Sequence, residues 1–108
     1  MGKANLQTLI KESEADKGIV FDSEGHVVDF YNISKENNIA AMANVILTMA
    51  DEFFQDTLNS KSLNQLVLTS NDGLIIINKY DNHTICLLTN DVSKLAMIKL
   101  TLKKIALQ

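Results

Sequence analysis

Three features that are missing or scarce in the 108-residue sequence limit the possible folds and the possible cellular compartments. There is no proline, so no helix or strand is forced to break. The single cysteine, Cys86, excludes an internal disulfide and fits a reducing compartment. No apolar run reaches the roughly 18 residues of a membrane span, and the first residues lack the apolar core of a signal peptide. These absences predict a cytoplasmic protein that does not insert into a membrane.

A large excess of either charge is also missing. The chain has a net charge of -3, with 21% charged and 46% hydrophobic residues, and the two signs are interspersed along it. This composition is typical of a globular protein and not of a disordered one. Because there is no basic surplus, binding to nucleic acid is disfavoured. The length fits one domain over 1–108 with a real hydrophobic core.

Motifs for catalysis or cofactor binding are missing too. The sequence has neither GxxxxGK[ST] nor GxGxxG, the glycine-rich loops that hold phosphates. His26, His83 and Cys86 fit no zinc-binding spacing, and a solvated turn is the usual environment for histidines at strand ends. Cys86 lies in an apolar strand, where burial raises the thiol pKa and disfavours a nucleophile. We therefore expect a non-enzymatic protein without a cofactor or a metal.

Apolar periodicity predicts an α+β fold, an α/β sandwich with helices available for both faces of a sheet. The unbroken apolar runs at 74–77 and 85–88 are typical of central strands that are covered on both faces. The Ser34 hydroxyl is placed to cap a long helix. In chain order the predicted elements are a helix near 6–14, a hairpin of 19–21 and 27–28, a long helix over 34–58, strands at 66–69, 74–77 and 85–88, and a helix over 92–105 whose inner face carries Val92, Leu95, Ile98, Leu102 and Ile105.

The long helix is apolar around too much of its circumference. At about 100° per residue the apolar arc spans roughly 200°, twice what packing on one core requires. The centre of the arc, expected in the core, comprises Ile39, Met42, Ala43, Ile46, Ala50 and Phe53. Its edges comprise Ala40, Leu47, Phe54 and Leu58 on one side and Val45 and Met49 on the other. A second copy of the chain is the expected cover for the surplus.

These patterns assign two surfaces to the long helix and its neighbouring strand. The strand at 66–69 is expected to be a sheet edge that pairs with its own copy. The predicted homodimer interface comprises Ala40, Val45, Leu47, Met49, Phe54, Leu66, Val67, Leu68 and Thr69. The polar remainder of the helix is the predicted partner-binding strip and comprises Asn44, Thr48, Asp51, Glu52 and Gln55.

Several of these patterns together resemble the Roadblock/dynein-light-chain family, over about residues 4 to 107. The segments that carry the resemblance are GIVFDSEGHVV at 18–28, the alanine-rich long helix, NDGLII at 71–76 and a closing helix of Leu, Ala and Lys. The resemblance implies a five-stranded antiparallel sheet in the order 2-1-5-4-3, with the long helix on one face and the terminal helices on the other. It also implies dimers formed through the long helix and the third strand.

The resemblance implies a function as well. Members of this family are non-catalytic platforms that regulate or tether Ras-like small GTPases or join larger assemblies such as dynein. The alternative is a small-molecule-binding sensor domain of similar sheet topology, which would need a pocket with a few convergent polar groups. The expected core is filled with Ile, Leu, Val and Met, so the platform is favoured over the sensor.

Overall fold

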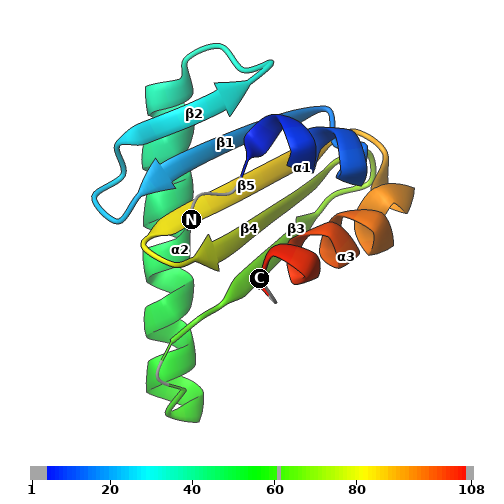
Figure 1. The fold of residues 1–108 in the computed structure, drawn as a ribbon. Helices are drawn as coiled ribbons and strands as arrows, with labels where there is room; N and C mark the ends of the chain where they lie inside the picture. Colours follow the sequence, from blue (N-terminus) through cyan, green and yellow to red (C-terminus); the bar gives the residue numbers. More distant parts are fainter. Residues whose placement is uncertain (1–4, 61, 107–108) are drawn as a thin grey trace.

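The computed structural model describes residues 5–60 and 62–106, which form three layers with a single sheet as the middle layer (Figure 1). Along the chain the helices and strands are α1 (Leu6–Ser13), β1 (Lys17–Asp22), β2 (Val27–Tyr31), α2 (Glu36–Leu58), β3 (Gln65–Thr69), β4 (Leu74–Tyr80), β5 (His83–Thr89), the 3-10 turn η1 (Val92–Lys94) and α3 (Leu95–Ala106). In this part of the chain, no helix combines the length and the apolarity needed to cross a bilayer.

The five strands form one antiparallel sheet in the order β2-β1-β5-β4-β3. This order confirms the expectation, and β4 and β5 occupy the interior positions that their continuous apolar sequences indicate. The register places Lys17, Leu88, Ile75 and Leu68 side by side in one row across β1, β5, β4 and β3. The edges of the sheet are β2 and β3.

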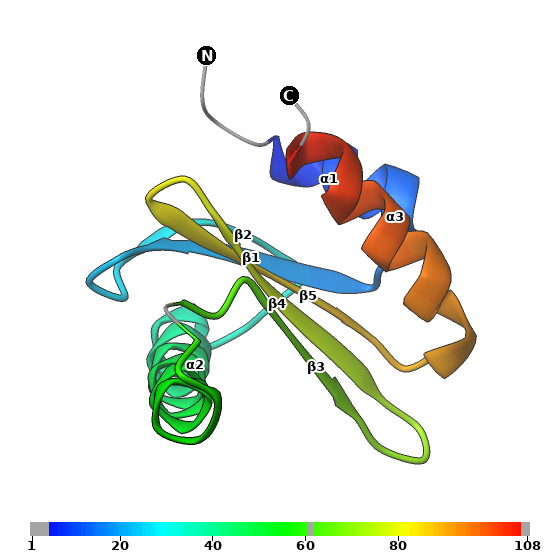
Figure 2. The same ribbon diagram turned by 90° about the horizontal axis from the view of Figure 1, so that it is seen from below.

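Two hydrophobic cores lie on opposite faces of this sheet. Figure 2 shows α2 on one face and the pair α1 and α3 on the other. The α1/α3 core contains Leu6 and Leu9 of α1 and Ile98 and Leu102 of α3, packed on Ile76 and its neighbours. The α2 core contains Ile19, Phe21, Ala40, Ala43, Leu47, Leu63, Ile77 and Cys86. The sandwich expected from the sequence is therefore confirmed.

The helix ends show which local signals set their bounds. The Asn5 side chain caps α1 by accepting from the Thr8 N–H at 3.3 Å. Ser34 does not cap α2, contrary to the expectation: the chain enters this helix through Lys35 in the left-handed conformation, with no side-chain cap. At the other end Asn59 is also left-handed, and its N–H donates to the Gln55 carbonyl, which ends the helix.

Polar contacts join α1 and β1 to the end of β5. The Asp16 carboxylate accepts from Thr89 Oγ1 and from the Asn90 N–H, each at 3.0 Å, and these donors lower the pKa of Asp16. The Glu14 carboxylate forms an ion pair with the Lys94 ammonium just before α3. These contacts fix the amino-terminal helix against the turn that leads into the last helix.

Candidate functional site

The face of α2 that packs on the sheet is lined by small side chains. Ala40, Ala43 and Leu47 are at most 6% exposed and lie against Ile19 and Phe21. Alanine methyl groups let the helix axis approach the sheet closely, so the longer Leu47 fills the remaining space. The sequence analysis placed the buried face of α2 at the wrong position around the helix axis. The larger side chains expected at the centre of the core, Met42, Ile46 and Phe53, lie outside it.

A continuous apolar surface runs along the outer side of α2, and we call it the apolar flank. Its side chains are 41% to 67% exposed, although each is large and apolar. The apolar flank comprises Met42, Val45, Ile46, Met49 and Phe53. At 100° per residue these five positions span about 100° of the helix, so they form one stripe and not scattered single residues. Soluble monomers rarely expose contiguous apolar stripes of this kind without a function.

The apolar flank borders a part of the sheet that α2 leaves uncovered. The opposite flank of α2 lies over the β1–β2 and β4–β5 turns, since Asn44 and Thr48 line a cavity with Ser23 and His83. Helical spacing places the apolar flank on the side of α2 away from these turns, nearer the other ends of the strands. There the partly buried Leu68, Ile75 and Leu88 pack beside the α2 core and line an open cavity of about 300 Å³. In Figure 2 the β3–β4 hairpin extends well beyond α2 on this side.

The predicted interface residues fall into three groups in the structure. Val45, Met49 and Phe54 are exposed on α2, as a docking surface requires. Ala40 and Leu47 are buried within the protomer at 0% and 4% exposure, so neither side chain is available to a partner, and this part of the prediction is corrected. On the edge strand β3, Leu66, Val67 and Leu68 are partly buried and Thr69 is exposed.

The predicted partner-binding strip also divides. Thr48, Glu52 and Gln55 are exposed, whereas Asn44 and Asp51 are partly buried beside the cavity at the β4–β5 turn. Asp51 has a structural task, because its Oδ1 accepts from the Leu63 N–H at 2.7 Å and anchors the segment that leads into β3. Its Oδ2 accepts from Gln55 Nε2 at 3.2 Å. The exposed members of the strip form the accessible polar face of α2.

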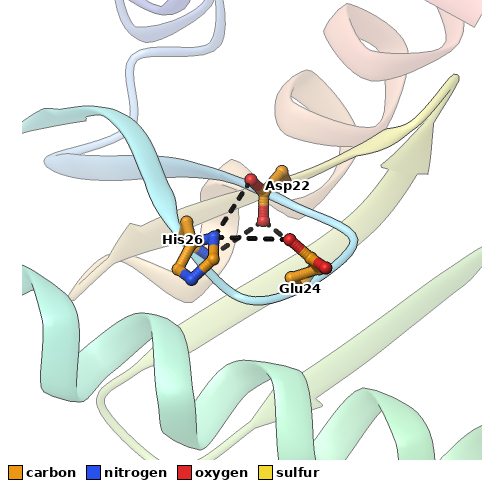
Figure 3. Close-up of side chains that lie close together, drawn as sticks. All are labelled: Asp22, Glu24 and His26. Carbon is orange, nitrogen blue, oxygen red and sulfur yellow. Dashed lines mark hydrogen bonds and ion pairs between the residues drawn. The ribbon is translucent and has the colours of Figure 1, made fainter.

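Three titratable side chains lie together in the β1–β2 turn, where the His26 imidazole points toward two carboxylates (Figure 3). His26 Nδ1 lies 3.5 Å from Asp22 Oδ2 and 3.7 Å from Glu24 Oε1. Asp22 Oδ1 accepts from the backbone N–H groups of Glu24 and His26 at 3.0 and 2.9 Å, and these bonds lower the pKa of Asp22. In this turn the Asp22 carboxylate accepts from backbone N–H groups that follow it closely in the chain, which is a common local pattern. The turn itself therefore explains why the three side chains lie together.

The single cysteine has the environment that the sequence predicts. Cys86 lies on β5 in the α2 core, and burial raises its thiol pKa to about 12. At neutral pH this sulfur is a protonated, apolar core atom.

The arrangement of helices and strands is similar to that of several solved structures. The gliding protein MglB from Thermus thermophilus superposes with a TM-score of 0.81 at 14% identity, covering 94% of this chain and 79% of that one. MglB from Myxococcus xanthus gives a TM-score of 0.79 at 11% identity, over 92% of this chain and 83% of that one. A Roadblock/LC7 domain from Streptomyces avermitilis gives 0.67 at 14% identity, over 96% of this chain and 97% of that one.

These likenesses confirm that the chain has the Roadblock/LC7 fold that its sequence motifs indicate. A further MglB structure of similar fold, with a TM-score of 0.81 at 15% identity over 94% of this chain and 79% of that one, is described as a tetrameric arrangement. No family model and no curated protein matches the sequence itself.

Proposed function

We propose that this chain is a non-enzymatic scaffold that forms a homodimer through α2 and β3 and binds a Ras-like small GTPase on the dimer. The observation that carries the proposal is the apolar flank of α2, five large side chains left in water along one stripe of a single helix. The Roadblock/LC7 fold supports the same function, because members of the family that the sequence resembles act as non-catalytic platforms for Ras-like GTPases or for larger assemblies.

A second copy of the chain is the occupant that fits the apolar flank. An antiparallel α2 from another copy would present the same stripe in return, as a two-fold interface requires. It would also cover the partly buried Leu68, Ile75 and Leu88, which continue the apolar surface onto the sheet. The exposed edge of β3 would then lie beside its copy, and antiparallel pairing there would join the two sheets.

The proposed interface is revised from the sequence-based one. It keeps Val45, Met49 and Phe54 together with Leu66, Val67, Leu68 and Thr69. Met42, Ile46 and Phe53 replace the buried Ala40 and Leu47. The interface is thus an apolar helix flank bordered by a strand edge.

The GTPase is proposed to bind the exposed polar face of α2, of which Thr48, Glu52 and Gln55 are the accessible residues. Two such faces, one from each copy, make a broader surface than a single helix offers. The switch segments of a Ras-like GTPase change conformation with the γ-phosphate, so a partner that contacts them prefers one nucleotide state. We expect this chain itself to bind neither GTP nor GDP, since its sequence has no phosphate-binding loop.

Calorimetric titration tests the GTPase part of the proposal. The Ras-like GTPases encoded in the same genome, loaded with GDP or a non-hydrolysable GTP analogue, are titrated into the full chain, and nucleotide alone is the blank. We expect heat from one GTPase in one nucleotide state and none from nucleotide. The double variant Thr48→Arg/Glu52→Arg should lose this heat, whereas Lys11→Glu, on the opposite layer, should keep it. If no GTPase gives heat in either nucleotide state, the proposal is wrong.

A further inference from the structure

A groove on the face opposite α2 runs between α3 and the edge strand β3. The inner side of α3 packs on the sheet through Ile98, Leu102 and Ile105, but a space remains between the helix and the start of β3. The resulting open hollow has a volume of about 460 Å³. Its lining includes Gln65, Asn78, Lys99, Leu100, Leu102 and Lys103. No part of the proposed GTPase-binding surface lies here, because α2 is on the other side of the sheet (Figure 2).

The wall of this groove formed by α3 is basic. The helix carries Lys99, Lys103 and Lys104 and no aspartate or glutamate, in a chain whose net charge is -3. Among the residues that the structure describes, Lys94 is the one lysine in an ion pair, so no described carboxylate neutralises Lys99 or Lys103. The groove lining contains two ammonium groups and no carboxylate.

Apolar and amide groups complete the groove. Leu100 is 53% exposed and supplies accessible apolar surface at the rim, whereas Leu102 is 1% exposed and belongs to the core beneath the groove. On the sheet, Gln65 Nε2 donates to Asn78 Oδ1 at 2.9 Å, and Asn78 Nδ2 donates to the Lys79 carbonyl at 3.2 Å. These bonds hold the amide side chains of the floor in fixed positions. A ligand with apolar groups beside negative charges would match this lining.

We propose that the groove between α3 and β3 binds an acidic amphipathic polypeptide segment. Its carboxylates pair with Lys99 and Lys103, and its apolar side chains pack on the exposed Leu100 and enter the hollow beside it. A flat lipid surface would meet the exposed Leu100 but leave the hollow of about 460 Å³ beside it unfilled, whereas the side chains of a polypeptide can enter it. Nucleic acid is disfavoured because the lining has two lysines and no aromatic side chain on which a base could stack. The chain would thus carry a second docking site, which can be filled while the α2 surface is occupied.

Selection from a display library of random 16-residue peptides, with the full chain as bait, tests this inference. We expect the selected peptides to combine Asp or Glu with Leu, Ile or Phe. Their affinity, measured by fluorescence anisotropy, should fall at least tenfold for Lys99→Glu/Lys103→Glu. The matched control Lys11→Glu/Lys17→Glu makes the same charge change elsewhere and should stay within twofold of wild type. Circular dichroism establishes that both variants fold.

Three results would overturn the proposal. One is a selection that yields no binders or only binders without acidic residues. Another is equal affinity of the acidic peptides for the groove variant and the control variant. The third comes from a parallel sedimentation assay with phosphatidylcholine vesicles containing phosphatidylserine. Binding to these vesicles that depends on Lys99 and Lys103, without peptide binding, would assign the basic helix to a membrane surface. None of these outcomes depends on whether a GTPase binds α2.

Discussion

Replacing Phe53 with glutamine should weaken self-association strongly while leaving the protomer folded. The Phe53 side chain is 67% exposed in the protomer, so about two-thirds of its apolar surface remains to be buried by a partner. Burying a whole phenylalanine side chain is worth about 1.5–3 kcal/mol, which gives roughly 1–2 kcal/mol for this fraction. A two-fold dimer contains the residue twice, so the loss is about 2–4 kcal/mol. That corresponds to a dimer dissociation constant raised about 30- to 1,000-fold.

Sedimentation velocity over a concentration series measures this change directly. Leu100→Gln is the matched control, because it replaces another exposed apolar side chain (53% exposed) on the opposite face of the sheet. The control should dissociate at the same concentration as wild type. Glutamine is a good helix former, so α2 itself should persist in the Phe53 variant. Equal dissociation constants for wild type and Phe53→Gln would refute the assignment of the apolar flank as the dimer interface.

The remaining predictions concern the protomer. Leu47→Ala should lower the free energy of unfolding by about 2–5 kcal/mol because Leu47 is 4% exposed, whereas Ile46→Ala, at 41% exposure, should cost under about 1 kcal/mol in urea melts of the monomer. Asp51→Ala should cost about 1.5–3 kcal/mol by leaving the Leu63 N–H without its charged acceptor, and Asp51→Asn, which keeps an acceptor oxygen, should cost less. Hydrogen-bond donors hold the pKa of Asp16 and Asp91 below the ordinary 3.8. The stability from these carboxylates is therefore complete above about pH 5 and is lost as the pH falls through their folded pKa. Thermal melts from pH 7 to pH 2.5 should show this loss, and Asp16→Asn should reduce it.

Much of the fold can be predicted from local sequence patterns. The unbroken apolar runs of β4 and β5 indicate interior strands, and the Asn71–Gly73 turn marks the hairpin between β3 and β4. The motif at 18–28 and the closing helix carry the resemblance from which the strand order follows. Each of these signals depends on residues that are close together in the chain.

The face of α2 that packs on the sheet could not be predicted from such local patterns. When the helix positions are ranked by hydrophobicity, large side chains such as Met42 and Phe53 are placed at the centre of the buried face. In the structure the helix approaches the sheet through Ala40 and Ala43, because small side chains allow the closest packing. The spacing of Ala40, Ala43 and Leu47 could have identified the buried face. It does so if small side chains are taken to mark the positions where a helix packs most closely on a sheet.

Contacts between residues that are far apart in the chain also could not be predicted from the sequence. The Asp51 carboxylate bonds to the N–H of Leu63, twelve positions along the chain, and Gln65 bonds to Asn78 across a strand pair. Both pairings depend on where the folded chain places each element. For this reason the polar strip read from the helix alone mixed exposed residues such as Thr48 with an anchoring residue, Asp51.

Native mass spectrometry of this chain mixed with the proposed Ras-like GTPase partner tests the central claim most directly. The chain has a mass of 12.0 kDa, so one or two added copies are readily resolved. We predict a complex with two copies of the chain and at least one GTPase, present in one nucleotide state and reduced in the other. Phe53→Gln should shift the chain to monomers and remove the complex. A stable complex of one copy with one GTPase, unaffected by Phe53→Gln, would contradict the dimeric platform.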